Sequence, residues 1–261
     1  MSSSLEGKVA LISGSSMGLG AAIARELHSR GAKVVINYPY PSEKANAEKV
    51  LQSMGPDARA VAVEADLSTA QGPRKLADEA ASAFGAKIDI LVNSAGINRL
   101  PLFLDDPDDA KVESAWNDVN YLNGRGTFFL TREVLKHLSR QNSRIVNVGS
   151  CISRIPAPAS SVYAGSKSLV EAYTQCWAME LPRKYGCTVN GVAPGPTATD
   201  SFLAAPQEVR DSLQAMSDAT PVAPRLGMPE EVAWLVASLC EERAGWVNGA
   251  YIPVSGGSPI F

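Results

Sequence analysis

The feature that most constrains this chain is a regular alternation of short, continuously apolar segments with longer segments of helical periodicity. The apolar segments are rich in Val and Ile and lack the polar alternation of a half-exposed strand, as expected when a parallel sheet is covered on both faces. This pattern predicts an α/β fold with a doubly wound parallel sheet. We expect seven strands, at 8–13, 33–37, 60–64, 88–92, 144–149, 187–192 and 249–253.

Helical patterns separate the expected strands, and the alternation continues to the last of them. We therefore expect the 261 residues to form a single Rossmann-type domain over 1–261, with helices on both faces of the sheet. The expected helices lie near 19–30, 43–54, 69–84, 110–138, 162–185 and 229–240.

Two segments interrupt the alternation. Residues 100–109 carry two prolines and four aspartates and are expected to form a solvated loop. Residues 194–229 are rich in proline and alanine, with a helical pattern near 206–216. Because long connections in compact domains are often functional, we interpret 194–229 as a lid over the substrate, with a passive surface excursion as the alternative.

Composition argues against several classes of protein. The net charge of −3 disfavours nucleic acid as the main partner. No apolar run approaches the ~20 residues that span a membrane, and residues 1–6 do not resemble a signal peptide. We therefore expect a cytoplasmic protein that binds neither nucleic acid nor membrane.

The cysteines and histidines do not indicate a metal site. Cys151, Cys176, Cys187 and Cys240 include no Cys-x-x-Cys pair, and no histidine cluster accompanies them. We expect free thiols and no bound metal. Cys151 follows a candidate catalytic serine, but we interpret it as a pocket-lining residue rather than a nucleophile.

A tyrosine and a lysine stand four positions apart in Tyr163-Ala-Gly-Ser-Lys167, within a helical pattern. Residues i and i+4 share a helix face, so the Lys167 ammonium is expected near the Tyr163 phenol. A nearby cation favours the phenolate and lowers its pKa, and a decrease of about three pKa units corresponds to about 4 kcal/mol. Tyr163 could then exchange a proton with a substrate oxygen.

Ser150 directly follows the predicted strand at 144–149. Ligands of open α/β sheets bind at the carboxyl ends of the strands. The Ser150 hydroxyl and the Tyr163 phenol are therefore expected to converge at one edge of the sheet.

A glycine cluster closes the first predicted strand and opens the first predicted helix. Gly14, Gly18 and Gly20 have the spacing Gly-x-x-x-Gly-x-Gly rather than Gly-x-Gly-x-x-Gly. Glycines let the backbone approach a phosphate closely, and a helix N-terminus offers amide groups and a positive dipole end. The cluster thus indicates a site for the pyrophosphate of a dinucleotide.

These motifs resemble those of the short-chain dehydrogenase/reductase family, along nearly the whole chain. The resemblance implies the catalytic residues Asn123, Ser150, Tyr163 and Lys167. Within the family, the chain is most similar to fungal NADPH-dependent polyhydroxynaphthalene and ketone reductases of secondary metabolism. The six matching motifs are Ser13-Gly14-Ser-Ser-Met-Gly18-Leu-Gly20, Asn93-Ser94-Ala95-Gly96, Asn123 in Leu-Asn-Gly-Arg-Gly-Thr-Phe-Phe, Ser150, Tyr163-x-x-x-Lys167 and Pro194-Gly195-x-x-x-Thr199.

The same resemblance implies a set of cofactor contacts. Asp66 is expected against the adenine ring or as a helix N-cap, and both roles are compatible. Ser94 departs from the family, which mostly carries asparagine there. The implied cofactor-binding residues are Gly14, Ser16, Met17, Gly18, Leu19, Gly20, Asn37, Tyr38, Asp66, Leu67, Asn93, Ala95, Gly96, Tyr163, Lys167, Pro194, Gly195, Thr197 and Thr199.

The end of the second predicted strand favours NADP(H), with NAD(H) as the alternative. A carboxylate at this position would bind the ribose 2′-hydroxyl of NAD and repel a 2′-phosphate, but the chain carries Asn37 and Tyr38. Met17 stands where many NADP-binding relatives carry a cation, so the phosphate would rely on Asn37, Tyr38, Ser16, Ser42 and Lys44. An aspartate at position 37 is expected to shift the preference toward NAD.

The expected reaction is hydride transfer between a nicotinamide and a ketone, secondary alcohol or phenolic substrate. Three residues separate Tyr163 from Lys167, whereas enoyl-reducing relatives have six, so carbonyl chemistry is favoured over C=C reduction. The alternatives are an NAD-linked alcohol dehydrogenase and a non-catalytic dinucleotide-binding sensor. Residues expected near an apolar pocket mouth are Arg99, Ile152, Arg154, Ile155, Pro156, Phe202 and Leu203.

The family resemblance also implies assembly into a homotetramer. In the family, the two helices expected at 110–138 and 162–185 pack against a two-fold mate. The second of these carries a broad apolar stripe, which favours a partner surface. That stripe consists of Leu169, Tyr173, Cys176, Trp177 and Glu180.

Overall fold

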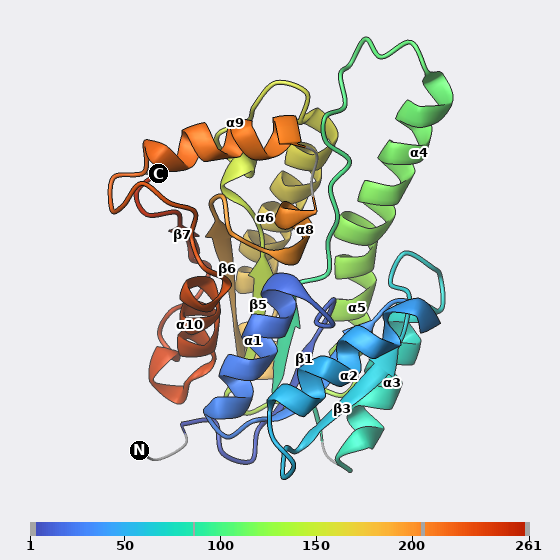
Figure 1. Cartoon of the computed structure of the whole chain (residues 1–261). Helices are drawn as coiled ribbons and strands as arrows, with labels where there is room; N and C mark the ends of the chain where they lie inside the picture. The colour runs from blue at the N-terminus through green and yellow to red at the C-terminus, as the bar shows by residue number, and fades with distance from the viewer. Residues whose placement is uncertain (1–3, 86, 205–206, 259–261) are drawn as a thin grey trace.

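Seven parallel strands form one sheet in the computed structural model, which describes residues 4–85, 87–204 and 207–258 (Figure 1). The strand order is β3-β2-β1-β4-β5-β6-β7, with a crossover from one half of the sheet to the other after β3. All seven expected strands are confirmed. They are β1 (Val9–Ile12), β2 (Lys33–Tyr38), β3 (Ala60–Glu64), β4 (Ile90–Asn93), β5 (Ser143–Val148), β6 (Cys187–Pro194) and β7 (Tyr251–Val254).

The central strands are apolar along their length because helices cover both faces of the sheet. Every residue of β1, β4, β5 and β6 is buried. The helices α1, α2 and α10 contribute to one apolar core and α3, α5 and α6 to the other. These helices are α1 (Gly18–Ser29), α2 (Lys44–Ser53), α3 (Gly72–Ala83), α5 (Thr127–Val134), α6 (Ser161–Glu180) and α10 (Pro229–Cys240).

The helix expected at 110–138 is not one regular helix. It consists of α4 (Asp109–Val119), a π-helical segment at Asn120–Gly126, and α5. A side chain at Gly124 would place its Cβ 2.8 Å from the Leu169 side chain of α6. The glycine and the wider π turn therefore accommodate the close approach of α6, and π turns are frequent at functional sites.

The helix expected at 162–185 ends at Glu180, and a short α7 (Pro182–Tyr185) follows. Proline lacks the amide donor that would continue α6, so a new helix starts at Pro182. Three short 3-10 turns complete the described elements, at Pro41–Glu43, Cys151–Ser153 and Glu242–Ala244.

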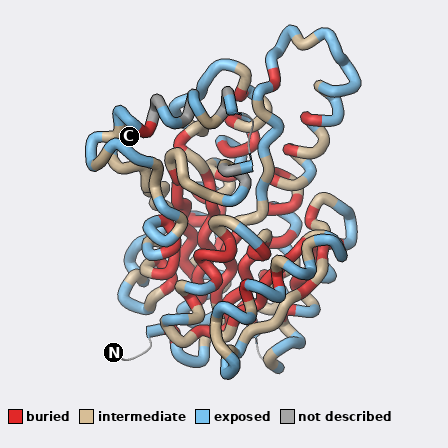
Figure 2. The backbone as a smooth tube through the Cα atoms, viewed as in Figure 1, coloured by how far each residue is buried: buried red, intermediate tan, exposed pale blue. Residues whose placement is uncertain are grey.

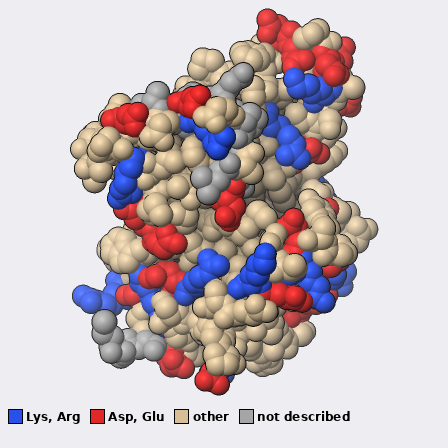
Figure 3. All heavy atoms as spheres, in the orientation of Figure 1, with Lys and Arg blue, Asp and Glu red and all other residues tan. Residues whose placement is uncertain are grey.

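Two exposed regions lie beyond the carboxyl ends of the strands (Figure 2). The loop before α4 is one of them, and Figure 3 shows acidic side chains gathered at its tip. The other is the long connection after β6, which contains α8 (Asp200–Leu203) and α9 (Gln207–Asp218). Across the described residues, none of the helices has the length and apolarity needed to span a membrane.

Candidate active site

Ser150, Tyr163 and Lys167 meet at the carboxyl end of β5, as expected from the sequence. Ser150 begins the 3-10 turn after β5 in an extended conformation, and Tyr163 and Lys167 lie on the first turns of α6. The Lys167 ammonium donates to the Val148 carbonyl at 3.0 Å and lies 5.8 Å from the centroid of the Tyr163 ring. The Ser150 side chain lies close enough to the Tyr163 phenol to act on its pKa.

The pKa of Tyr163 moves opposite to the sequence expectation. Burial raises it to about 12, although the nearby Ser150 side chain acts in the other direction. Burial also lowers the pKa of Lys167 to about 8. The ammonium faces the ring and is itself desolvated, so loss of water outweighs its attraction for the phenolate. Tyr163 is therefore a protonated phenol at neutral pH.

Asn123 lies in the π-helical segment and is buried. Its side chain accepts from the Ile97 amide at 2.9 Å and donates to the Ile97 carbonyl at 2.9 Å and to Ser166 Oγ at 3.0 Å. A Cβ added at Gly96 would lie 3.2 Å from both Asn123 Oδ1 and Lys167 Nζ. Asn123 thus ties the loop after β4 to α6 beside Lys167.

The N-terminus of α1 already binds an anionic group of the protein. The Gly18 amide donates to the Asp200 carboxylate at 2.9 Å, and the first turn of α1 carries no acidic residue of its own. Gly18 has φ +54°, a conformation that favours glycine. A carboxylate at this amide matches the expected preference of a helix N-terminus for negative charge.

The Asn37 carboxamide is used within the fold. Its oxygen accepts from the Gly14 amide at 3.0 Å, and its nitrogen donates to the carbonyls of Tyr38 (3.2 Å), Val63 (3.4 Å) and Ala65 (3.0 Å). Asn37 is 2% exposed. Its side chain therefore holds the glycine loop against the ends of β2 and β3, a role that the sequence did not reveal.

Asp66 caps a turn rather than a helix. Its carboxylate accepts from the Ser68 amide at 2.9 Å and from Ser68 Oγ at 2.7 Å, whereas α3 begins six residues later, at Gly72. The neighbouring Leu67 side chain belongs to the core. Contacts from this segment to a ligand would thus come from Asp66 and from backbone atoms.

Asn93 joins β4 to its neighbours. Its amide donates to Thr131 Oγ1 at 2.9 Å and to Asn147 Oδ1 at 2.8 Å. Ser13 Oγ accepts from the amides of Ser94 and Ala95, each at 3.0 Å. These bonds fix the loops after β1 and β4 side by side.

The remaining expected cofactor residues lie around the same edge of the sheet. Thr199 caps α8 and accepts from the Phe202 amide at 3.3 Å, and Thr197 bridges to Gly227 within the long connection. Gly195 donates its amide to the Val254 carbonyl. Ser16 is buried, and Met17 is partly exposed beside Gly18.

A small cavity adjoins Tyr163 and is too narrow to admit a water molecule. Its lining is mainly apolar, and Arg99 at its rim is paired with Asp118 at 3.0 Å. Arg154, the other arginine expected at the pocket mouth, is paired with Glu171 at 2.6 Å. The side chain of Leu203 lies outside the described residues. The cavity is lined by Arg99, Leu100, Leu102, Val119, Ala159, Ser160, Val162 and Tyr163.

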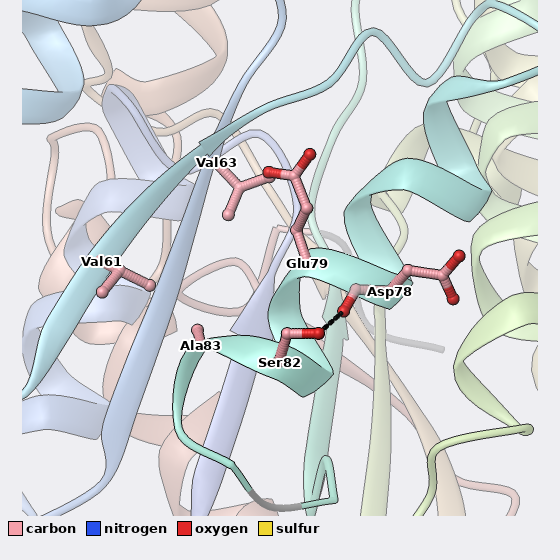
Figure 4. Close-up of a pocket in the computed structure, with 6 residues that line it drawn as sticks. All are labelled: Val61, Val63, Asp78, Glu79, Ser82 and Ala83. Atoms are coloured by element: carbon pink, nitrogen blue, oxygen red, sulfur yellow. Dashed lines mark hydrogen bonds between the residues drawn. The ribbon is translucent and has the colours of Figure 1, made fainter.

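A larger hollow of about 440 Å³ lies elsewhere, between β3 and α3 at one edge of the sheet (Figure 4). Val61 and Val63 form part of its lining, together with Ser82 and the two acidic residues of α3. Asp78 pairs with Arg74 and His137, and Glu79 pairs with Lys75. We interpret this hollow as a surface feature with paired charges and place no chemistry there.

The Cys151 thiol donates to the Ala193 carbonyl at 3.1 Å, and burial raises its pKa to about 11. A buried, protonated thiol is a poor nucleophile, which supports the prediction that Cys151 is not a nucleophile. Among the described residues, no group of three or more His, Cys, Asp or Glu could hold a metal ion.

Two residues near the site were not predicted from the sequence. Asp200 binds the first amide of α1 from the long connection. Tyr251, at the start of β7, bonds through its hydroxyl to the backbone of Ser150. Position 251 follows position 150 by 101 residues, and no local pattern signals a contact over that separation.

A doubly wound sheet with a glycine loop after its first strand is the architecture of dinucleotide-binding enzymes. Residues 14–258 match the model of a family described as "Enoyl-(Acyl carrier protein) reductase". The chain belongs to the short-chain dehydrogenase/reductase family of oxidoreductases, which confirms the resemblance seen in its motifs.

Curated relatives are similar over almost the whole chain, and the three below are fungal. The short-chain dehydrogenase/reductase FrzI of a Cladobotryum species is 39% identical, covering 97% of this chain and 96% of the relative. Versicolorin reductase 1 of Aspergillus parasiticus is 37% identical, with 97% of each chain covered. A probable tetrahydroxynaphthalene reductase of Zymoseptoria tritici is 36% identical, covering 97% of this chain and 95% of the relative.

Solved structures share the fold closely. A short chain dehydrogenase from Burkholderia cenocepacia in complex with NADP has a TM-score of 0.86 and 34% identity, covering 97% of this chain and 98% of that one. A blue fluorescent protein from a metagenomic library in complex with NADPH has a TM-score of 0.85 and 31% identity, covering 98% of this chain and 100% of that one.

Proposed function

We propose that this oxidoreductase uses NADP(H) to reduce a ketone to a secondary alcohol. The observation that carries the proposal is the convergence of Ser150, Tyr163 and Lys167 at the carboxyl end of β5. A hydroxyl, a protonated phenol and an ammonium at one position suit proton transfer to a carbonyl oxygen. Asn123 completes the proposed catalytic set by holding the loop beside Lys167.

The proposed chemistry assigns one task to each side chain. When bound, the reduced nicotinamide supplies a hydride to the carbonyl carbon. Tyr163 gives its proton to the carbonyl oxygen, and Ser150 donates a hydrogen bond to the same oxygen as it gains charge. Lys167 stabilises the tyrosinate that remains. The high pKa of Tyr163 keeps the proton in place at neutral pH, which favours the reducing direction.

The groups at the carboxyl edge of the sheet fit a dinucleotide. The first amide of α1 donates to the Asp200 carboxylate, and a pyrophosphate bound at this amide would take the place of that carboxylate. Proposed contacts of the dinucleotide are Gly14, Ser16, Met17, Gly18, Leu19, Gly20, Asp66, Leu67, Asn93, Ala95, Gly96, Tyr163, Lys167, Pro194, Gly195, Thr197 and Thr199.

Preference for NADP(H) over NAD(H) is proposed on two grounds. Neither Asn37 nor Tyr38, at the end of β2, carries the carboxylate that would repel a 2′-phosphate. The solved relatives above are complexes with NADP and with NADPH. Because the Asn37 amide is engaged by backbone groups, its contribution would be to hold the loop and leave the site uncharged.

An uncharged, apolar ketone is the proposed substrate class. The cavity beside Tyr163 is lined mainly by apolar side chains, and both nearby arginines already pair with carboxylates. Relatives named for versicolorin and tetrahydroxynaphthalene support a cyclic aromatic or phenolic substrate. Residues 194–229, whose Asp200 binds the α1 N-terminus, are the proposed lid over that substrate.

A homotetramer is the proposed assembly. Aromatic side chains gather on α5 and α6, where Tyr173 and Trp177 stack at 5.0 Å and Phe128 lies 5.6 Å from Tyr173. Phe128 and Phe129 are each 38% exposed, and Trp116 of α4 is 56% exposed. An exposed aromatic surface of this kind favours a partner. Sedimentation that gives the monomer mass of 27.6 kDa would contradict this assembly.

Cofactor titration and a substrate panel test the function. Fluorescence titration should give a lower Kd for NADPH than for NADH, and NADPH should be consumed with cyclic aromatic ketones. Preference for NADH with alcohol oxidation would instead support an NAD-linked dehydrogenase. Turnover of enoyl thioesters alone would contradict carbonyl reduction, and tight cofactor binding without any turnover would support a sensor.

A further inference from the structure

The Tyr251 side chain fills space left by two glycines. Tyr251 opens β7 and is paired in register with Gly191 of β6. A Cβ at Gly191 would lie 2.4 Å from the Tyr251 ring, and one at Gly149 would lie 2.0 Å from its hydroxyl oxygen. Side chains at either position would occupy the place of the ring, so the two glycines and the tyrosine form one packing unit next to Ser150.

The Tyr251 hydroxyl bonds to both backbone groups of Ser150. It accepts from the Ser150 amide at 3.0 Å and donates to the Ser150 carbonyl at 3.1 Å. The Gly149 amide is still bonded across the sheet, to the Val192 carbonyl at 2.8 Å. At the next residue β5 has ended and the 3-10 turn begins. The Ser150 amide therefore bonds to the Tyr251 hydroxyl instead of to a strand carbonyl.

A short network holds the Tyr251 hydroxyl from the opposite side. Ser153 Oγ lies 3.1 Å from it and 2.8 Å from a carboxylate oxygen of Glu171 on α6. The other Glu171 oxygen accepts from Arg154 at 2.7 Å, and the Arg154 guanidinium lies 5.3 Å from the centroid of the Tyr251 ring. Charged and hydroxyl groups thus restrict where the Tyr251 oxygen can lie.

We propose that Tyr251 is a positioning residue that fixes Ser150 for carbonyl reduction, an inference that rests on the proposed function. The Tyr251 hydroxyl bonds to the amide and to the carbonyl of Ser150, on either side of the Cα atom that carries the Ser150 side chain. Loss of that hydroxyl leaves the Ser150 amide without its acceptor, although the Ser150 carbonyl keeps its bonds from Ser153, and lets the Ser150 hydroxyl move away from Tyr163. The effect on turnover then passes through Ser150, which distinguishes it from simple filling of the core.

Tyr251→Phe tests the proposal because the ring, and hence the packing against Gly149 and Gly191, is retained. We expect kcat to fall about tenfold, with the Kd for NADPH unchanged. In a Ser150→Ala background, the same substitution should lower kcat by less than about twofold, because the group it positions is gone. An equal loss in both backgrounds would overturn the proposal.

Hydrogen exchange gives a readout that needs neither cofactor nor turnover. In the ligand-free protein, Tyr251→Phe should raise amide exchange in residues 149–154 about tenfold or more, since the Ser150 amide loses its acceptor. Tyr185→Phe is the matched control, because that ring contacts Arg140 and Lys184 instead. Unchanged exchange would overturn the proposal. An inactive wild-type enzyme would refute the proposed function, and the exchange result would still show whether Tyr251 holds the Ser150 backbone.

Discussion

Polar side chains are used differently at two places along the carboxyl edge of the sheet, the end of β2 and the end of β5. At the end of β2, the Asn37 side chain bonds to the backbone of the glycine loop and to backbone carbonyls at the end of β3. At the end of β5, Tyr163 is half-buried and Lys167 buried, with pKa values displaced in opposite directions. The first arrangement stabilises the backbone, and the second holds the two ionisable groups that the proposed reaction uses.

The family motifs therefore contain residues of two kinds, those that stabilise the fold and those that are proposed to take part in the reaction. A carboxamide that satisfies its own donors and acceptor within the fold offers little to a ligand. A phenol and an ammonium that lie side by side with strongly shifted pKa values are instead typical of a functional site. Substitutions at the end of β2 should therefore change stability, and those at the end of β5 should change turnover.

The largest effect is expected at Lys167. Lys167→Met keeps most of the side-chain volume but removes the ammonium, so both the support for the tyrosinate and the expected cofactor contact are lost. We expect kcat/KM for the ketone to fall about 10³-fold and the Kd for NADPH to rise about tenfold. Steady-state kinetics and fluorescence titration measure these two changes. Wild-type turnover in this variant would show that the ammonium has no catalytic role.

Asn37→Asp should act mainly on stability. The new carboxylate oxygen would face the carbonyls of Tyr38, Val63 and Ala65 in place of a donor. We expect the free energy of unfolding to fall by about 3 kcal/mol. Urea denaturation measures it, with Gln52→Glu on the exposed face of α2 as the control. A fully stable variant that prefers NADH would instead support the prediction from the sequence, in which residue 37 acts on cofactor preference.

The pH dependence follows from Lys167. Its pKa of about 8 lies below the ordinary value of 10.5, so its positive charge is present below pH 8 and is lost above it. We expect kcat/KM for NADPH to be constant at lower pH and to fall about tenfold per pH unit above this value. A profile that stays level through pH 10 would mean that the charge of Lys167 does not affect productive binding.

The smallest effect is expected at Cys151. Its thiol is buried and bonded to the Ala193 carbonyl, and its pKa is near 11. Cys151→Ser should leave kcat within about twofold of the wild type. Iodoacetamide should likewise leave turnover unchanged at neutral pH. Rapid inactivation that the serine variant resists would make Cys151 part of the chemistry after all.

The fold was largely predictable because each strand and helix is encoded by adjacent residues. Apolar runs located all seven strands, and the spacing of Tyr163 and Lys167 placed both on α6. The π turn around Asn123 was not predictable, because it depends on the approach of Leu169 to Gly124. A local periodicity does not record which helix will pack against it.

The properties of the site were less predictable than its location. The direction of the Tyr163 pKa depends on burial, which arises from segments distant in sequence. The role of Asn37 depends on carbonyls from β3, and the placement of Ser150 depends on Tyr251 from β7. Each is a balance among long-range contacts, which no motif of a few residues contains.

The most direct test of the central claim is a comparison of wild type with Tyr163→Phe, using NADPH and a cyclic aromatic ketone. Phenylalanine retains the half-buried ring and removes the hydroxyl group whose proton is assigned to the carbonyl oxygen. We expect kcat to fall about 10³-fold while the Kd for NADPH stays within about threefold of the wild-type value. A variant with kcat within about threefold of wild type would contradict the assignment of Tyr163 as the proton donor.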